Sequence, residues 1–169
     1  MRRVLVIGNA GSGKTTFAGA LSEKTGIPVR HLDRLYWFGQ WEHLHRDEFD
    51  QVLQTELERE QWIIDGNYDR TLPLRLSYCD TVFFFDLPTI ACLWGATKRV
   101  LCSYGKSRED MGGNCPERFD RRQWELYKHI WTFNRKNRKH YYALLKDRKD
   151  VVVFKSRRAA RKYIREAVR

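Results

Sequence analysis

The chain has 169 residues, of which 42% are hydrophobic and 31% charged, and these proportions are typical of one globular domain rather than a disordered protein. No apolar run approaches the length of a membrane span, and the stretch after the basic N-terminus, Val4–Ile7, is too short for a signal peptide. The net charge of +11 is uneven, because residues 1–97 carry a net charge of −3 and residues 98–169 a net charge of +14. The basic half attracts polyanions such as nucleotides, phosphorylated substrates or nucleic acid, or it simply provides solvated helix faces.

The pattern of apolar residues predicts five strands that alternate with five helices. The strands are expected at residues 2–7, 28–33, 62–65, 80–87 and 150–156. The helices are expected at residues 15–24, 46–60, 89–103, 120–146 and 157–168. In the second helix, the residues expected to face the core are Phe49, Val52, Leu53 and Leu57.

This alternation predicts a three-layer α/β/α domain over residues 1–169, with a parallel sheet covered by helices on both faces. Ligands of such sheets bind beyond the carboxyl ends of the strands. The segment Gly8–Thr15, Asp33, Asp65 and Ser156 all lie at the ends of predicted strands. They are therefore expected to converge on one site.

Residues Gly8–Thr15 (GNAGSGKT) fit the pattern GxxxxGK[ST] between a predicted strand and a predicted helix. Glycines let backbone N–H groups wrap a phosphate chain, and the start of the following helix adds partial positive charge. Lys14 is expected near the β and γ phosphates, and Thr15 offers a hydroxyl to Mg²⁺. The pattern therefore predicts binding of a nucleoside triphosphate, but not the reaction that follows.

Asp65 ends the apolar stretch in WIIDG, at the tip of the third predicted strand. A carboxylate there can hold the hydration shell of Mg²⁺, whereas the alternative is a turn residue that caps the next segment. The chain is too short for the added domains of a motor protein, and it has no NKxD-like motif at a strand end for reading guanine. We therefore expect a kinase rather than a motor or a GTPase.

Five segments carry a resemblance to a known group of proteins: GNAGSGKTT, HLDRLYW, WIIDGNY, FFFDLP and REDMGGNCPERFD. With them the chain resembles the small P-loop kinases of the nucleoside monophosphate kinase group, to which shikimate and gluconate kinases are related. It is most similar to small bacterial proteins labelled DNA topology modulation protein. The resemblance implies a parallel five-stranded sheet of order 2-3-1-4-5, a short lid, and phosphoryl transfer from Mg-ATP to a small acceptor.

The resemblance also implies roles for residues near the acceptor. Asp33 occupies the position at which similar kinases place an aspartate on the acceptor hydroxyl, although a helix cap or an ion pair is the alternative. Adenylate kinases carry DGxPR after the third strand, whereas this chain has DGNYDR at residues 65–70, which argues against AMP as the acceptor. Arg70 and Arg75 either bind an acidic acceptor or face solvent.

Residues 104–118 contain two glycines, a proline and mixed charges, and they lie where such kinases insert a mobile lid. Arg99 precedes this segment, whereas Arg108 and Arg118 lie within it. Arginines that a closing lid delivers neutralise charge on the transferred phosphoryl group. The adjacent glycines at 112–113 are candidates for the hinge of the lid.

These interpretations together define the candidate site. The expected catalytic residues are Lys14, Asp33, Asp65, Arg99, Arg108 and Arg118. The expected nucleotide contacts are Gly8, Asn9, Ala10, Gly11, Ser12, Gly13, Lys14, Thr15, Thr16 and Arg157, and the expected metal ligands are Thr15 and Asp65. Gly95 stands where many adenylate kinases stack an arginine on adenine, so contact with the base is expected to differ.

Dense aromatic residues leave further alternatives open. Tyr36, Trp37 and Trp41 follow Asp33 and either wall the acceptor pocket or form core. Aromatic residues interleaved with arginines also suit single-stranded nucleic acid, so the main rival is a nucleotide-binding DNA-interaction protein without kinase activity. We expect at most weak, nonspecific nucleic acid binding through the basic half, no membrane partner, and a monomer or homodimer.

The four cysteines at positions 79, 92, 102 and 115 have neither CxxC spacing nor a neighbouring His cluster. This arrangement argues against a zinc site or a disulfide framework. We therefore expect reduced thiols in a cytoplasmic protein, with Cys79, Cys92 and Cys102 in the core.

Overall fold

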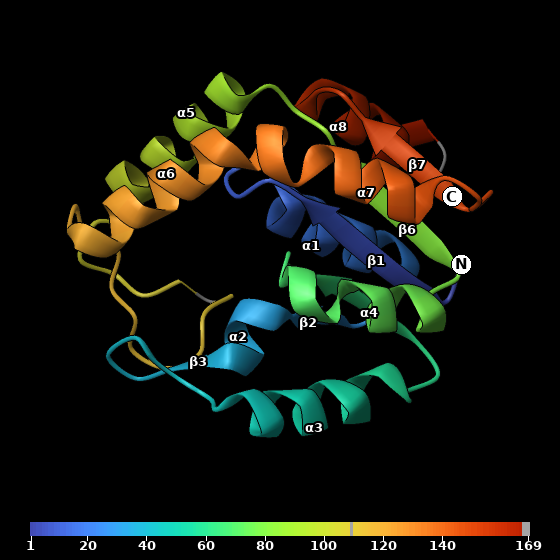
Figure 1. Ribbon diagram of the computed structural model, residues 1–169, viewed down its shortest axis with the longest axis horizontal. Coiled ribbons are helices and arrows are strands. Elements are labelled where there is room, and N and C mark those ends of the chain that lie inside the picture. The colour runs from blue at the N-terminus through green and yellow to red at the C-terminus, as the bar shows by residue number, and fades with distance from the viewer. Residues whose placement is uncertain (109, 167–169) are drawn as a thin grey trace.

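Five parallel strands form the central sheet of the protein, in the order β2-β5-β1-β6-β7 (Figure 1). The computed structural model describes residues 1–108 and 110–166, so Glu109 of the expected lid and Val168 at the expected end of the last helix lie outside the described residues. The strands are β1 (Arg3–Gly8), β2 (Val29–His31), β5 (Trp62–Asp65), β6 (Thr81–Phe85) and β7 (Val151–Phe154). Counted along these five strands, the order is 2-3-1-4-5, and the predicted α/β fold is confirmed.

Helices cover both faces of the sheet. They are α1 (Lys14–Thr25), α2 (Leu32–Tyr36), α3 (Arg46–Leu57), α4 (Leu72–Tyr78), α5 (Thr89–Cys102), α6 (Arg121–Lys136), α7 (Arg138–Leu145) and α8 (Arg157–Glu166), with a 3₁₀ turn at Asp69–Thr71. Successive residues of a strand point to opposite faces, so Val4 and Val6 of β1 pack in the core with α1, α5 and α8. Leu5 and Ile7 pack in the second core, with α3, α4 and α7.

The segment after β2 differs from its prediction. The strand expected at residues 28–33 ends at His31, and Asp33 lies in the first turn of the short helix α2. A two-stranded antiparallel hairpin follows, formed by β3 (Trp37–Phe38) and β4 (Glu42–His43). The sequence analysis predicted neither α2 nor the hairpin, because elements of two to five residues are too short to show a hydrophobic period.

Two predicted helices also need correction. The helix expected at 120–146 is divided into α6 and α7 at Asn137, whose side-chain amide donates a hydrogen bond to Asp69. On α3, Val52 is exposed, so its predicted place in the core is wrong. The other three apolar residues of that helix are buried, and they alone form its inner face.

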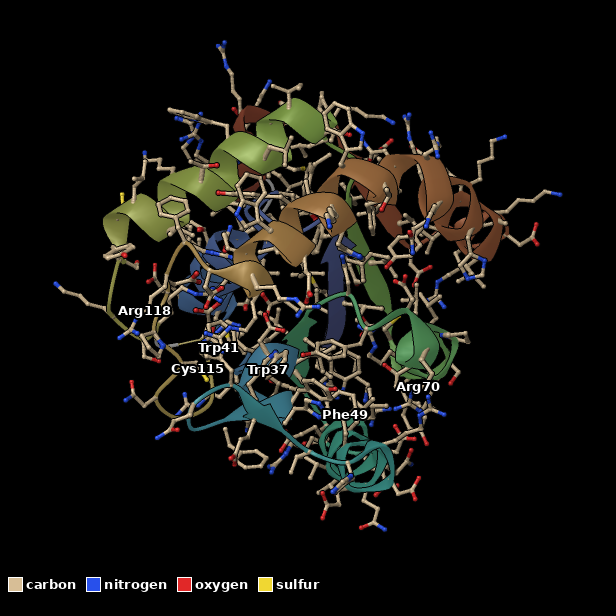
Figure 2. The ribbon with its side chains drawn as sticks, turned by 60° about the vertical axis from the view of Figure 1, so that its left-hand side comes forward. Trp37, Trp41, Phe49, Arg70, Cys115 and Arg118 are labelled. Carbon is tan, nitrogen blue, oxygen red and sulfur yellow. The ribbon has the colours of Figure 1, made fainter. Side chains whose placement is uncertain are left out.

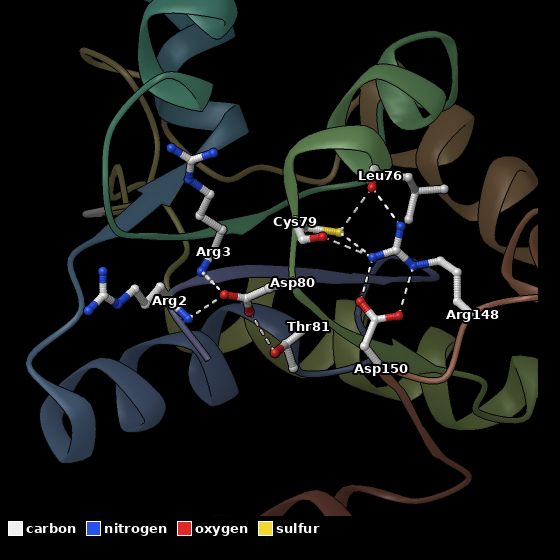
Figure 3. Close-up of polar contacts among 8 residues, drawn as sticks. All are labelled: Arg2, Arg3, Leu76, Cys79, Asp80, Thr81, Arg148 and Asp150. Carbon is white, nitrogen blue, oxygen red and sulfur yellow. Dashed lines mark hydrogen bonds and ion pairs between the residues drawn. The ribbon is translucent and has the colours of Figure 1, made fainter.

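Charged residues at the amino ends of the strands bind backbone groups of neighbouring segments (Figure 3). The carboxylate of Asp80 accepts hydrogen bonds from the backbone N–H groups of Arg2 and Arg3, at 2.7 and 3.1 Å. The guanidinium of Arg148 pairs with Asp150 and donates to the carbonyl oxygens of Leu76 and Cys79. These contacts fix the start of β1 and the segment that precedes β7.

The cysteines are only partly placed as the sequence predicts. All four cysteines are free thiols, but Cys102 is exposed at the end of α5, so its predicted place in the core is wrong. Cys92 is buried and Cys79 partly buried.

Within the described residues, no helix combines the length and apolar character that crossing a membrane would require.

Candidate active site

The segment Gly8–Thr15 runs from the last residue of β1 through a loop into the first turn of α1, as its glycine pattern predicts. Gly8 has φ +136° and Gly11 has φ +70°, conformations that other residues rarely adopt. A Cβ atom on Gly8 would lie 2.4 Å from the carbonyl oxygen of Phe85, and one on Gly11 would lie 2.3 Å from that of Cys92. The loop therefore lies directly against the backbone of β6 and of α5.

Hydrogen bonds attach this loop to two further segments. The backbone N–H of Gly8 donates to Oδ1 of Asn67, at 3.1 Å, in the segment after β5. The side-chain amide of Asn9 donates to the carbonyl oxygen of Ile130 in α6, at 3.0 Å. Gly8 and Asn9 thus hold the loop in place, and their direct contact with the nucleotide stays a prediction.

Lys14, the first residue of α1, folds back over the loop. Its Nζ donates to the carbonyl oxygen of Asn9, at 2.9 Å. Burial lowers the pKa of Lys14, and the charges of Asp65 and Asp33 oppose this shift. The ammonium group therefore lies near both the loop and two carboxylates, where it can contact a phosphate held by the loop.

Asp65, the last residue of β5, joins two neighbouring segments. Its Oδ2 accepts a hydrogen bond from the hydroxyl of Thr15, at 2.8 Å, and its Oδ1 pairs with Nδ1 of His31, at 2.5 Å. Burial lowers the pKa of His31, but the hydrogen bond and charge of Asp65 outweigh it, so the pKa is raised above 6.5. Sequence analysis missed His31, although the strand order places it beside Asp65 in the β2–β5 register.

The donor set of Thr15 and Asp65 fits Mg²⁺. This cation prefers oxygen ligands and keeps several waters, so it is usually bound by one or two protein oxygens together with substrate phosphates. Among residues 1–108 and 110–166, no cluster of three His, Cys, Asp or Glu residues could hold a metal ion by itself. The hydroxyl of Thr15 and the carboxylate of Asp65 are consistent with a cation that arrives with its nucleotide.

Asp33 is a second carboxylate close to the loop, and it is partly buried. Its Oδ1 accepts a hydrogen bond from the hydroxyl of Tyr68, at 3.0 Å. Burial raises the pKa of Asp33, while the charge of Arg108 and the hydrogen bond from Tyr68 oppose that shift. A cavity-lining carboxylate with a raised pKa is a candidate proton acceptor.

Arg75 has neither of its two expected roles, because it is fully buried in α4. Its guanidinium donates to the carbonyl oxygens of Gly66, Asn67 and Tyr68, at 3.0, 2.6 and 2.9 Å. Burial lowers the pKa of Arg75 to about 10, so the group remains charged at neutral pH. Arg75 thus fixes the segment that supplies Asn67 to the loop and Tyr68 to Asp33.

The expected lid, residues 104–118, contains a buried ionic cluster. Oε1 of Glu117 lies 2.8 Å from Nε of Arg108 and 3.2 Å from Nε of Arg99, and Arg108 also pairs with Asp110 at 2.6 Å. Glu117 is 2% exposed, so it neutralises two of the predicted catalytic arginines inside the protein. Sequence analysis missed Glu117, because an acidic residue in a segment of mixed charge gives no sign of burial.

The lid packs against the β3–β4 hairpin, where Figure 2 shows Trp37, Trp41 and Cys115 close together. The indole N–H of Trp41 donates to the carbonyl oxygen of Pro116, at 3.3 Å. A Cβ atom on Gly112 would lie 1.7 Å from the carbonyl oxygen of Trp37. The predicted hinge at 112–113 is thus a point of close backbone contact between the lid and the hairpin.

These segments enclose a cavity of about 1590 Å³ beyond the carboxyl ends of the strands. Trp37, Trp41 and Tyr68 also line it, whereas Tyr36 packs against Phe49 in the core. The predicted site residues that line the cavity are Ala10, Gly11, Gly13, Lys14, Thr15, Thr16, Asp33, Asp65, Arg99, Arg108, Arg118 and Arg157.

Other predicted positions do not line this cavity. Ser12 is fully buried within the loop, and Ser156 is exposed at the end of β7. Arg70, in the 3₁₀ turn before α4, pairs with Asp50 of α3 at 2.6 Å, and Figure 2 shows it away from Trp37 and Trp41. An acceptor in the cavity is therefore expected to meet Arg99, Arg108 or Arg118 rather than Arg70 or Arg75.

Comparison with solved structures identifies the fold. A shikimate kinase from Bacteroides thetaiotaomicron matches with a TM-score of 0.57 and 16% sequence identity, over 98% of this chain and 95% of that one. A gluconokinase from Sinorhizobium meliloti 1021 matches with a TM-score of 0.58 and 13% identity, over 99% and 89%. A shikimate kinase from Aquifex aeolicus vf5 matches with a TM-score of 0.51 and 20% identity, over 98% and 92%.

Searches by sequence gave a different result. No protein-family model matches the chain, and no curated protein matches it either. The structural likeness at 13–20% identity shows the P-loop kinase fold over nearly the whole chain. The chemistry of the site has to be argued from its residues.

Proposed function

We propose that this protein transfers the γ-phosphoryl group of Mg-ATP to a small acceptor that carries a hydroxyl or an anionic group. The observation that carries the proposal is the convergence of Lys14, the Thr15–Asp65 pair and Asp33 on one cavity. A nucleotide-binding site alone needs the loop and the lysine. A second carboxylate that lines the same cavity has a use when a proton must be accepted from an attacking group.

The loop binds the triphosphate through backbone N–H groups, and Lys14 places a positive charge beside the β and γ phosphates. Thr15 and Asp65 would hold Mg²⁺, which supplies neutralisation of phosphate charge when bound. His31 donates to Asp65 and orients that carboxylate toward Thr15. These residues fix the donor so that its terminal phosphoryl group faces the acceptor side of the cavity.

Asp33 accepts the proton of the acceptor hydroxyl as the oxygen attacks phosphorus, and the bond from phosphorus to the bridging oxygen of ADP breaks. Arg99, Arg108 and Arg118 neutralise charge on the phosphoryl oxygens in the transition state. The pairing of Arg99 and Arg108 with Glu117 holds two of these guanidinium groups at the cavity wall before substrates bind.

The test is a screen for acceptor-dependent ADP release across nucleosides, nucleotides and small hydroxy acids. With an acceptor identified, Asp65→Asn should lower turnover far more than it lowers ATP affinity, because the carboxylate acts on the metal-bound triphosphate. Glu23→Gln, an exposed change on α1, serves as the control. Equal turnover of Asp65→Asn and the parent protein would return Asp65 to a structural role.

A second candidate function is supported by the outer face of α6. Trp124 and Trp131 are 65% and 64% exposed, and Lys128 and Arg135 continue the same face at helical spacing. Alternating aromatic and basic side chains suit the bases and phosphates of single-stranded nucleic acid. An oligonucleotide should then bind with an affinity that falls steeply with salt, and tight binding without acceptor-dependent ADP release would favour this function over the kinase.

A further inference from the structure

Arg157, the first residue of α8, lines the cavity and contacts the phosphate-binding loop. Its Nη2 donates to the carbonyl oxygens of Gly11 and Ala91, both at 2.7 Å, and its Nε donates to that of Ser12, at 3.2 Å. The guanidinium is therefore bound to two consecutive loop carbonyls and to the first turn of α5. Arg157 is expected from sequence to contact the nucleotide, yet these donors are directed at the loop.

Gly95 makes this arrangement sterically feasible. A Cβ atom at that position would lie 2.3 Å from Nη2 of Arg157 and 2.2 Å from the carbonyl oxygen of Gly11. A glycine inside a helix is destabilising relative to alanine. The chain accepts this cost at the one turn of α5 where the loop and Arg157 approach the helix backbone.

The direction of the loop peptides connects this contact to ligand binding. In a trans peptide, the carbonyl oxygen and the following N–H point to opposite sides. With the carbonyl of Ser12 directed at Arg157, the N–H of Gly13 is directed away from it. A charged donor that holds two loop carbonyls thus favours the peptide orientation in which the N–H groups point away from it and toward a phosphate.

We infer that Arg157 is a positioning residue that holds the loop in its phosphate-binding conformation. The missing side chain of Gly95 leaves the space that the guanidinium occupies. This inference rests on the proposed function, since it concerns the triphosphate site of that reaction. Arg157 acts on the polyphosphate through the loop and has no part in recognising the base. Its loss should therefore affect every ligand that carries the triphosphate, with or without a nucleoside.

The test compares two ligands, Mg-ATP and magnesium tripolyphosphate, by isothermal titration calorimetry. Arg157→Ala and Gly95→Ala should each weaken both ligands by similar factors of at least about tenfold, because hydrogen bonds from a charged donor are among the stronger ones. Arg157→Lys keeps the charge but cannot reach three carbonyls in fixed geometry, so it should fall between Arg157→Ala and the parent.

The controls separate a local effect from a general one. Gly19→Ala adds the same methyl group to α1, where a Cβ meets nothing within 4 Å, and Lys162→Ala removes a positive charge from the exposed side of α8. Neither should change the affinity for the two ligands. Thermal unfolding of every variant is measured first, to identify the variants that are folded at the titration temperature. If Gly95→Ala is not folded there, Arg157→Ala and Arg157→Lys are enough for the test.

Chemical rescue provides a readout that a merely structural role would not move. Guanidinium ion at a low, non-denaturing concentration should restore binding to Arg157→Ala but not to the double variant with Gly95→Ala, in which the space is filled. Sodium chloride at the same concentration is the reference, since it matches the ionic strength.

Three results would overturn one or both proposals. Unchanged affinities in folded Arg157→Ala would overturn the inference about Arg157. A loss confined to ATP would also overturn it, by showing that Arg157 acts on the nucleoside. A parent protein that binds neither ligand would overturn the triphosphate site itself, and with it the proposed function.

Discussion

At the amino ends of the strands, the charged groups of Asp80, Arg148 and Asp150 are bound by the backbone or by one another (Figure 3). At the carboxyl ends, Lys14 and Asp33 are partly buried, and both line a cavity of about 1590 Å³. The charged groups at the amino ends stabilise the folded backbone. Those at the carboxyl ends are held in a low-dielectric place where they act strongly on whatever enters.

Supporting charges and reacting charges thus lie at opposite edges of one sheet. A substitution at the amino edge should change stability and leave ligand binding unchanged, whereas one at the carboxyl edge should do the reverse. Arg75 and Arg157 are instructive intermediate cases. They lie near the carboxyl edge, yet their donors are bound by backbone carbonyls, as those of Arg148 are.

The largest effect is expected at Lys14. Lys14→Ala should lower the single-turnover rate of ADP formation by about 10²–10³, because a positioned donor to the reacting phosphate is lost. Its melting temperature should stay close to that of the parent, since the side chain contacts the loop and not a hydrophobic core. Lys24→Ala, at the exposed end of α1, is the control. If Lys14→Ala forms ADP at the parental rate, Lys14 at the carboxyl edge of the sheet takes no part in the reaction.

Arg108 and Arg118 should show a smaller effect on the rate. Arg108→Gln and Arg118→Gln should each slow transfer by about tenfold, since several arginines share the developing charge. Equilibrium binding of ATP should hardly change, because these residues act on the acceptor side and on the transition state. Arg121→Gln, an exposed change on α6, is the reference. If both lid variants turn over at the parental rate, residues 104–118 have a structural role and no part in the reaction.

Asp80 tests the opposite edge. Asp80→Asn should lower the free energy of unfolding by about 1 kcal/mol, through weaker hydrogen bonds to two backbone N–H groups, and leave ATP affinity unchanged. Burial raises the pKa of Asp80, but hydrogen bonds from Thr81 and the backbone outweigh it and lower the pKa below 3.8. This stabilisation is therefore complete above pH 3.8 and is lost as the pH falls through the folded-state pKa.

Denaturant unfolding across this pH range measures the Asp80 contribution. The parent should lose stability toward acid more steeply than Asp80→Asn, because the variant lacks the titrating carboxylate. Asp147→Asn, at an exposed turn, should follow the parent. A changed ATP affinity in Asp80→Asn would contradict the separation of the two edges.

The smallest effect is expected at Tyr68. Because its hydrogen bond lowers the pKa of Asp33, Tyr68→Phe should raise that pKa further. The rate of transfer should then fall off at a higher pH on the acid side, where Asp33 becomes protonated and cannot accept a proton. Tyr127→Phe loses a hydrogen bond to Thr97 elsewhere and should keep the parental profile. If the acid side of the pH–rate profile does not shift in Tyr68→Phe, Asp33 is not the group that accepts the proton.

Sequence reasoning succeeded where the determinants are local. The loop at residues 8–15 could be predicted because glycine, lysine and threonine are adjacent in the chain and their chemistry requires that spacing. Asp65 could be placed at the edge of the sheet because an apolar run ends there. The five-strand order followed from the resemblance, and the alternation of strands and helices supports it.

The remaining features depend on contacts between distant segments. His31 becomes a partner of Asp65 only when β2 pairs with β5, and the burial of Glu117 requires two arginines from different elements. Arg75 looks like any charged residue of an amphipathic helix, because the three carbonyls that it binds lie in another turn of the chain. No pattern within one segment of the sequence indicates such contacts.

The close contact at Gly112 has a consequence for how the protein tolerates substitution. Every side chain larger than hydrogen would collide with the backbone of the hairpin, so a saturation library should lose all variants at this codon. Gly39, in the hairpin itself, has open space around a Cβ and should accept most residues. Mutational intolerance at Gly112 would then mark a joint between lid and hairpin, and not a group that takes part in the reaction.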